Sequence, residues 1–250
     1  PRDGIIALRS QSAAATWLRA TNSGWLHGPQ STTSDNEGYF THQAPRTFAP
    51  KPGYSVKYWK ARGIKAFEVD VLSVLRRKLE RLTGLIEDSE NRFSQVRIGD
   101  SRRLGSVPKR ARNFSVVVTS PPYYGMRTYV QDQWLRNWFL GGSSNVDYGA
   151  GSQLDHGGQS VFAKSLGKVW RNMAKSAAPE LHMYVRFGVI PSVSVDGKQL
   201  MIDSLEASGI EWRIVSVRKA DTADAGNRQA TQMQTGSSAA LEYDFHVLRA

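Results

Sequence analysis

The spacing of apolar residues in the first third of the chain predicts helices. Within residues 69–85 apolar side chains recur every three or four positions, with arginine and lysine on the opposite face, which is typical of an amphipathic helix. Residues 4–26, rich in alanine and with two tryptophans, predict one or two core helices, and residues 54–63 predict a helix that stops at a glycine. The segment 28–53 is rich in Pro, Ser, Thr, Asn and Gly and is expected to be a loop.

From residue 93 onward, segments with strand character alternate with segments of helical periodicity. The segment 114–120 is nearly continuous valine, as expected for a strand covered on both faces. The alternation predicts an α/β fold with a mostly parallel, doubly wound sheet. No helix separates the last two strands, so we expect them to pair antiparallel. The predicted strands are 93–100, 114–120, 180–190, 211–220 and 242–250, and the predicted helices are 132–140, 160–177 and 198–209.

Composition narrows the class of protein. The chain has 250 residues, 40% of them hydrophobic, which is enough for one substantial domain. No apolar run approaches the length of a membrane span. The chain starts at Pro1 without a basic-then-apolar leader, so we expect a trimmed or partial sequence. The cysteine count of 0 excludes disulfides, thiolate zinc sites and cysteine nucleophiles, and fits a reducing cytoplasm. The five histidines are scattered, so we expect no metal site.

Charge suggests a partner. The formal net charge is +11 and the pI is near 10.0, which favours a polyanion, with nucleic acid first, because clustered cations gain from releasing phosphate counterions. A solvated basic surface is the alternative, and charge alone does not separate the two.

The valine strand runs directly into Ser120, Pro121, Pro122 and Tyr123. Open α/β sheets bind ligands beyond the carboxyl ends of their strands. Two prolines stiffen the corner and leave carbonyl oxygens available as acceptors, Ser120 adds a side-chain acceptor, and Tyr123 offers a flat face. This set suits a planar heterocycle with an exocyclic amine. A structural turn or a proline-rich recognition segment is the alternative.

The corner resembles motif IV, (S/D/N)-P-P-(Y/F/W), of the S-adenosylmethionine-dependent amino methyltransferases. The long form "VVVTSPPYYGMRTY" looks most like the DNA N4-cytosine and N6-adenine modification methylases, and the resemblance covers roughly residues 93–250. It implies a Rossmann-like class I methyltransferase sheet with an antiparallel last strand. It also implies a catalytic corner at Ser120, Pro121, Pro122 and Tyr123, and cofactor contacts at Asp100, Ser101 and Thr119. Asp100 could instead cap the segment that follows it.

One part of the family pattern is not found. The Phe-x-Gly-x-Gly cofactor loop has no counterpart, and the nearest glycine cluster, residues 147–153, follows a helix and not a strand. We therefore expect an incomplete sheet, with its first strands and cofactor loop upstream of Pro1 or on another chain. Residues 1–90 are then a helical and Pro-rich connecting region packed on the sheet, and residues 91–250 the catalytic half.

The resemblance implies methyl transfer from S-adenosylmethionine to the exocyclic amine of a flipped DNA base. Serine in the first motif position favours cytosine N4, and the lack of cysteine excludes methylation of the cytosine ring carbon. Adenine N6 methylation, RNA or protein amino methylation, and a non-catalytic DNA-binding remnant or subunit remain alternatives. Expected partners are DNA and a cognate restriction endonuclease. Basic and aromatic candidates for DNA contacts, with a solvated loop as the alternative for the basic cluster, are Arg102, Arg103, Lys109, Arg110, Arg127 and Tyr129.

Overall fold

The computed structural model divides the chain into two compact units, each considered by itself. One comprises Pro1–Ser94 and Thr128–Gly149, and the other Gln95–Arg127 and Ala150–Ala250. Residues 128–149, which the sequence analysis assigned to the catalytic half, group here with the N-terminal unit. The structure describes residues 12–23, 52–63, 70–83, 97–107, 114–126, 131, 133–147, 154, 157–190, 193–220 and 241–250.

The regular elements described in the first unit are all helices, as the apolar spacing predicted. Asp70 caps its most amphipathic helix by accepting hydrogen bonds from the backbone N–H groups of Leu72 and Ser73, at 3.1 and 3.3 Å. Arg136 donates through Nε to the carbonyl oxygen of Ser23 at 2.9 Å, which ties two helices of the unit together. The helices are α2 (Ala13–Ser23), α3 (Pro52–Ala61), α4 (Val71–Thr83) and α6 (Trp134–Phe139).

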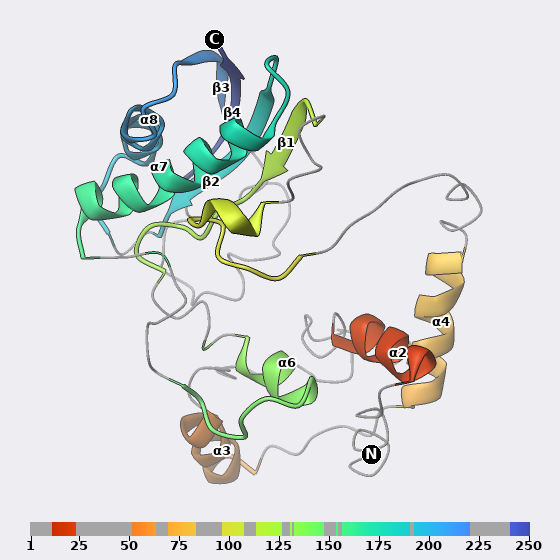
Figure 1. Ribbon diagram of the computed structural model, residues 1–250. Helices are drawn as coiled ribbons and strands as arrows, with labels where there is room; N and C mark the ends of the chain where they lie inside the picture. Colours follow the sequence, from red (N-terminus) through yellow and green to blue (C-terminus); the bar gives the residue numbers. More distant parts are fainter. Residues whose placement is uncertain are drawn as a thin grey trace. The chain divides into compact units, whose positions relative to one another are not determined.

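The second unit contains a mixed four-stranded sheet with the order β1-β2-β4-β3 (Figure 1). Strand β1 is parallel to β2, and β4 is antiparallel to both of its neighbours. The predicted antiparallel pairing of the last two strands is confirmed. Strands β1, β2 and β3 of the described sheet run in the same direction, and the final strand, β4, runs antiparallel between β2 and β3. The strands are β1 (Val116–Thr119), β2 (His182–Val189), β3 (Trp212–Lys219) and β4 (Leu241–Arg249).

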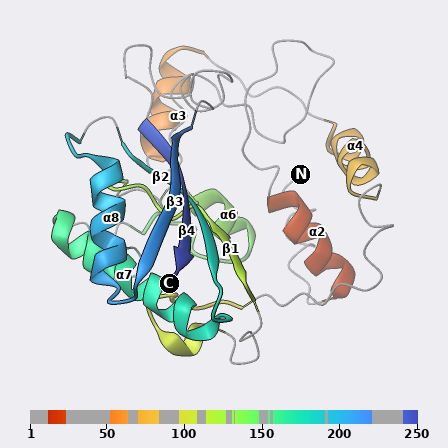
Figure 2. The same cartoon turned by 90° about the horizontal axis from the view of Figure 1, so that it is seen from above.

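Helices α7 (Gln159–Ser176) and α8 (Gly197–Ala207) cover one face of this sheet (Figure 2). The core forms where both helices meet the alternate residues of β2 and β4 that point toward them. Trp170 is buried there and donates through Nε1 to Ser204 Oγ at 2.9 Å. The core side chains include Phe162, Leu166, Trp170, Met183, Val185, Phe187, Leu200, Met201, Phe245 and Val247.

The other face of the sheet differs from expectation. Val116 and Val118 are 53% and 79% exposed, so the prediction that the valine strand is covered on both faces is wrong. Among the described helices of this unit, α7 and α8 both lie on the core face, so a doubly wound arrangement is not seen. The described end of the predicted strand 93–100, residues 97–100, forms no strand and leads into a 3-10 turn, η1 (Leu104–Ser106).

None of the helices in the described ranges is both long and apolar enough to cross a membrane.

Candidate active site at the Ser-Pro-Pro-Tyr corner

The Ser-Pro-Pro-Tyr corner, residues 120–123, bulges out of the sheet because it contains one residue more than the facing segment of β2. Thr119 pairs with Val185, and pairing resumes where Tyr124 bridges Val189. Four residues of the corner therefore lie opposite only three of β2. The extra residue cannot be accommodated in a regular ladder, so the chain bulges out between two anchored points.

Proline explains where the ladder stops. His182 donates its backbone N–H to the carbonyl oxygen of Ser115 at 2.8 Å, so alternate residues from Ser115 onward point their backbone groups toward β2. The alternate residues after Ser115 are Val117, Thr119 and Pro121, and Pro121 has no N–H to donate to β2. The ladder resumes when Tyr124 donates its N–H to Gly188 O at 3.3 Å.

Tyr123 is fixed at the corner by its hydroxyl group. The phenol donates to Glu242 Oε1 at 2.5 Å. A β-carbon at Gly188 would lie 3.2 Å from Cε2 of Tyr123, so glycine leaves room for the ring beside β2. Burial, and then the hydrogen bond and the charge of Glu242, raise the pKa of the phenol well above its usual range.

Tyr124 belongs to the core and not to the pocket wall. Its side chain is only 9% exposed, and its ring meets Phe162 of α7 edge-on with centroids 5.1 Å apart. The second tyrosine of the corner therefore anchors the end of the excursion against the helix layer.

The exposed face of the sheet carries an open pocket of about 720 Å³ at the start of the corner. The Ser120 side chain lines it and is exposed. Within the described part of the chain, no hydrogen bond is made by the Ser120 hydroxyl. The other lining residues come from all four strands: Val118, Thr119, Tyr184, Val185, Arg186, Ser216, Arg218, Asp244, Phe245 and His246.

An ion pair crosses the floor of this pocket. Arg186 donates to both oxygens of Asp244 at 2.7 Å, from paired positions on β2 and β4. The hydrogen bonds from Arg186 lower the pKa of Asp244, and the carboxylate in turn raises the pKa of the guanidinium. This bidentate pair keeps both groups charged beside the Tyr123–Glu242 contact.

Aromatic rings form a stack next to the ion pair. Tyr184 and His246 face each other with centroids 4.4 Å apart and planes 11° apart, and His246 stacks in turn on His182. Nδ1 of His182 lies 3.0 Å from Nε2 of His246. Within the described ranges, no group of three or more His, Asp or Glu side chains is placed to hold a metal ion.

The structure places the predicted cofactor residues at different pockets. Thr119 lines the sheet-face pocket, whereas Asp100 lines a second pocket that shares no residue with the first. Both oxygens of Asp100 are engaged by the Arg102 side chain, at 2.8–3.1 Å. Ser101 is exposed, and its carbonyl oxygen accepts from Asn172 Nδ2 at 3.0 Å.

The predicted DNA contacts are described only in part. Arg102 and Arg103 lie in the turn after Asp100 and line the second pocket. The other four candidates lie outside the described residues, as does most of the glycine cluster 147–153: they are Lys109, Arg110, Arg127 and Tyr129.

Several residues of the pocket and of the corner were not singled out from the sequence. Glu242, Arg186 and Asp244 are brought to the corner by the pairing of β2 with β4. A signal was present, because polar residues alternate with apolar ones in both strands and so mark a shared exposed face. The pairing register was needed to see which of them meet.

Comparisons of the chain with models of protein families, with curated proteins and with solved structures found no match.

Proposed function

We propose that this chain binds a flipped DNA base at the Ser-Pro-Pro-Tyr corner and takes part in methylation of its exocyclic amine, with cytosine N4 as the favoured position. The observation that carries the proposal is the excursion of Ser120–Tyr123 from the end of a parallel strand, with an exposed serine hydroxyl beside a pocket. Ligands of α/β sheets bind at such strand ends.

The corner supplies acceptors for an amine. The Ser120 hydroxyl and a carbonyl oxygen of the proline pair accept the two amine hydrogens, which directs the nitrogen lone pair away from the ring. The amine nitrogen would gain the methyl group as the sulfonium S–CH3 bond breaks and S-adenosylhomocysteine leaves, and one amine hydrogen would leave as a proton to solvent. The Tyr123 ring, held by Glu242, packs on the base. Rigid placement of the amine is the contribution to rate that these residues make.

The order of the strands supports the same proposal. A last strand inserted antiparallel beside β2, with β3 outside it, agrees with the sheet that the methyltransferase resemblance implies. The methyl group in this proposal comes from S-adenosylmethionine. The described residues contribute the binding and orientation of the base.

The test is transfer of labelled methyl from S-adenosylmethionine to duplex DNA, followed by digestion to nucleosides and identification of the product by mass. Ser120→Ala should lower the rate at least tenfold, since one acceptor is lost. Ser115→Ala is the matched control, because Ser115 is an exposed serine just before the same strand. N6-methyladenine as the sole product would overturn the cytosine assignment, and equal rates for the two variants would overturn the role of the corner.

A non-catalytic DNA-binding unit is a second candidate. It is favoured by the separation of Asp100 and Thr119 into two pockets. Calorimetry with S-adenosylmethionine distinguishes the two functions: DNA binding without measurable binding of the methyl donor would support the second candidate, and binding of both would support the first.

A further inference from the structure

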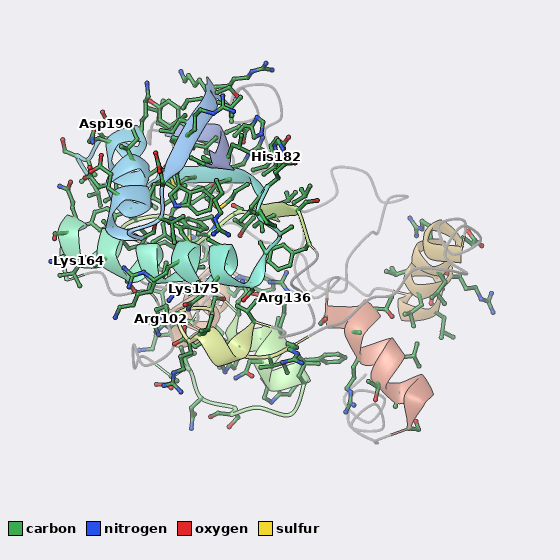
Figure 3. All side chains as sticks on the ribbon, turned by 45° about the horizontal axis from the view of Figure 1, so that its top comes forward. Arg102, Arg136, Lys164, Lys175, His182 and Asp196 are labelled. Carbon is green, nitrogen blue, oxygen red and sulfur yellow. The ribbon has the colours of Figure 1, made fainter. Side chains whose placement is uncertain are left out.

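A second pocket of about 530 Å³ lies between the turn after Asp100 and the first half of α7. Four of its seven lining side chains are basic, namely Arg102, Arg103, Lys164 and Lys168, and Asp100 is its single acid. Val161 and Ser165 complete the lining. This group is called the basic pocket below. Figure 3 labels Arg102 and Lys164, one from the turn and one from α7.

The fold of α7 explains why the lysines gather there. The apolar face of the helix is buried against the sheet, so its exposed positions form one stripe. Lys164 and Lys168 are exposed and lie four residues apart on that stripe, which places them one turn from each other. Neither lysine makes a hydrogen bond or an ion pair with any described residue, so both ammonium groups are available to a ligand.

The opposite side of the basic pocket is a fixed turn. Asn172 of α7 donates to the carbonyl oxygen of Ser101 at 3.0 Å, and Arg103 donates its N–H to Asp100 O at 2.8 Å. The Asp100 carboxylate holds the Arg102 side chain at 2.8 Å. Arg102 is therefore positioned before any ligand arrives, which reduces the entropy lost on binding.

We infer that the basic pocket binds phosphate groups of the DNA backbone. An excess of cations at an open depression lined mostly by polar side chains suits a polyanion, because each neutralised phosphate releases condensed counterions. The turn supplies arginine and the helix supplies lysine, two side chains that commonly contact phosphate. The basic pocket shares no residue with the sheet-face pocket, so it would hold the backbone while the base is bound elsewhere.

The inference rests on the proposed function for the identity of the partner, DNA, and does not depend on methyl transfer. Its test is fluorescence anisotropy of the full chain with a labelled random-sequence DNA duplex, repeated over a range of salt concentrations. The pocket variant is Lys164→Ala with Lys168→Ala. The matched control is Lys198→Ala with Lys219→Ala, which removes the same charge from exposed lysines outside the basic pocket. Circular dichroism checks that both variants are folded.

The pocket variant should bind more weakly, and its slope of log affinity against log salt should be shallower by about 1.8, or about 0.9 for each lost phosphate contact. The control should keep a slope close to that of the original chain. Equal changes in the two variants, absence of DNA binding by the original chain, or binding of RNA and not of DNA would each overturn the inference. Lost methylation with retained slope differences would overturn the proposed function alone. Methylation with unchanged slopes would overturn the inference alone.

Discussion

The Tyr123 hydroxyl donates to Glu242 Oε1 at 2.5 Å, although the two residues are 119 positions apart in the sequence. The contact connects the corner after β1 to the start of the last strand. It fixes the direction of the Tyr123 ring from outside the motif itself. The strength of this contact can be tested without any knowledge of the reaction.

Glu242→Gln should lower the pKa of Tyr123 without restoring it to 10.0, because burial is the larger cause of its rise and remains in the variant. The measurement is NMR titration of tyrosines labelled at Cζ. A folded-state pKa above the unfolded one stabilises the protein fully below about pH 10, and this contribution is lost as pH rises further. Asp244→Asn should shift Tyr123 less, and an equal shift would contradict the assignment to Glu242.

Gly167→Ala should destabilise the packing of α7 against α8. A β-carbon at Gly167 would lie 2.9 Å from backbone atoms of Ala207, Ser204 and Ser208, and these cannot move aside as a side chain would. We expect a loss of about 1–3 kcal/mol. Hydrogen exchange of α7 and α8 peptides measures it locally, which matters in a chain of two units. Gly53→Ala is the control, because nothing lies within 4 Å of its β-carbon, and it should leave exchange unchanged or slower.

The pKa of Asp100, held at about 2 by hydrogen bonds from Arg102, should rise toward 3.8 in Arg102→Ala. In the original chain the stabilisation from this pair is fully present above pH 3.8 and is lost as pH falls through about 2. Carboxyl ¹³C NMR follows the titration. Arg103→Ala is the matched control with a smaller expected shift, since Arg103 acts only through its charge. An unchanged midpoint in Arg102→Ala would contradict the prediction.

Asp244→Asn should weaken the pairing of β2 with β4. The Arg186 and Asp244 side chains are 39% and 45% exposed, so solvent screening limits the loss to about 0.5–1 kcal/mol. Because the pair lowers the pKa of Asp244, the difference from the original chain should be present above pH 3.8 and shrink below it. Hydrogen exchange of β2 and β4 peptides at about pH 7 reports it. Glu206→Gln, an exposed acid on α8, should have no such effect.

The spacing of apolar and polar residues within short segments was sufficient to predict most of the helices and strands that the structure describes. The periodicity of residues 160–177 and 180–190 reflects one buried face each, and α7 and β2 formed there. The position of Ser120 after a strand was likewise readable, because strand and motif are contiguous. The capping alternative for Asp100 is local too, since its Oδ1 accepts from the backbone N–H of Arg102 at 3.0 Å.

Pairing between distant segments was not readable. The exposure of Val118 depends on which face of β1 the helices cover, and a run of valines looks the same in both cases. The engagement of the Asp100 carboxylate depends on side-chain geometry, since Arg102 two residues later donates to both of its oxygens.

The excursion after β1 has a consequence for how the corner tolerates change. The corner projects outward because its four residues lie opposite only three residues of β2. The prolines make this projecting loop stiffer, but the extra residue alone is enough to make it project. Residue types at the corner can therefore vary while the loop keeps its protrusion, but loss of one residue would let the strand run straight from Thr119 to Tyr124. The length of the corner is a property of the sheet, and its chemistry is a separate property of the side chains.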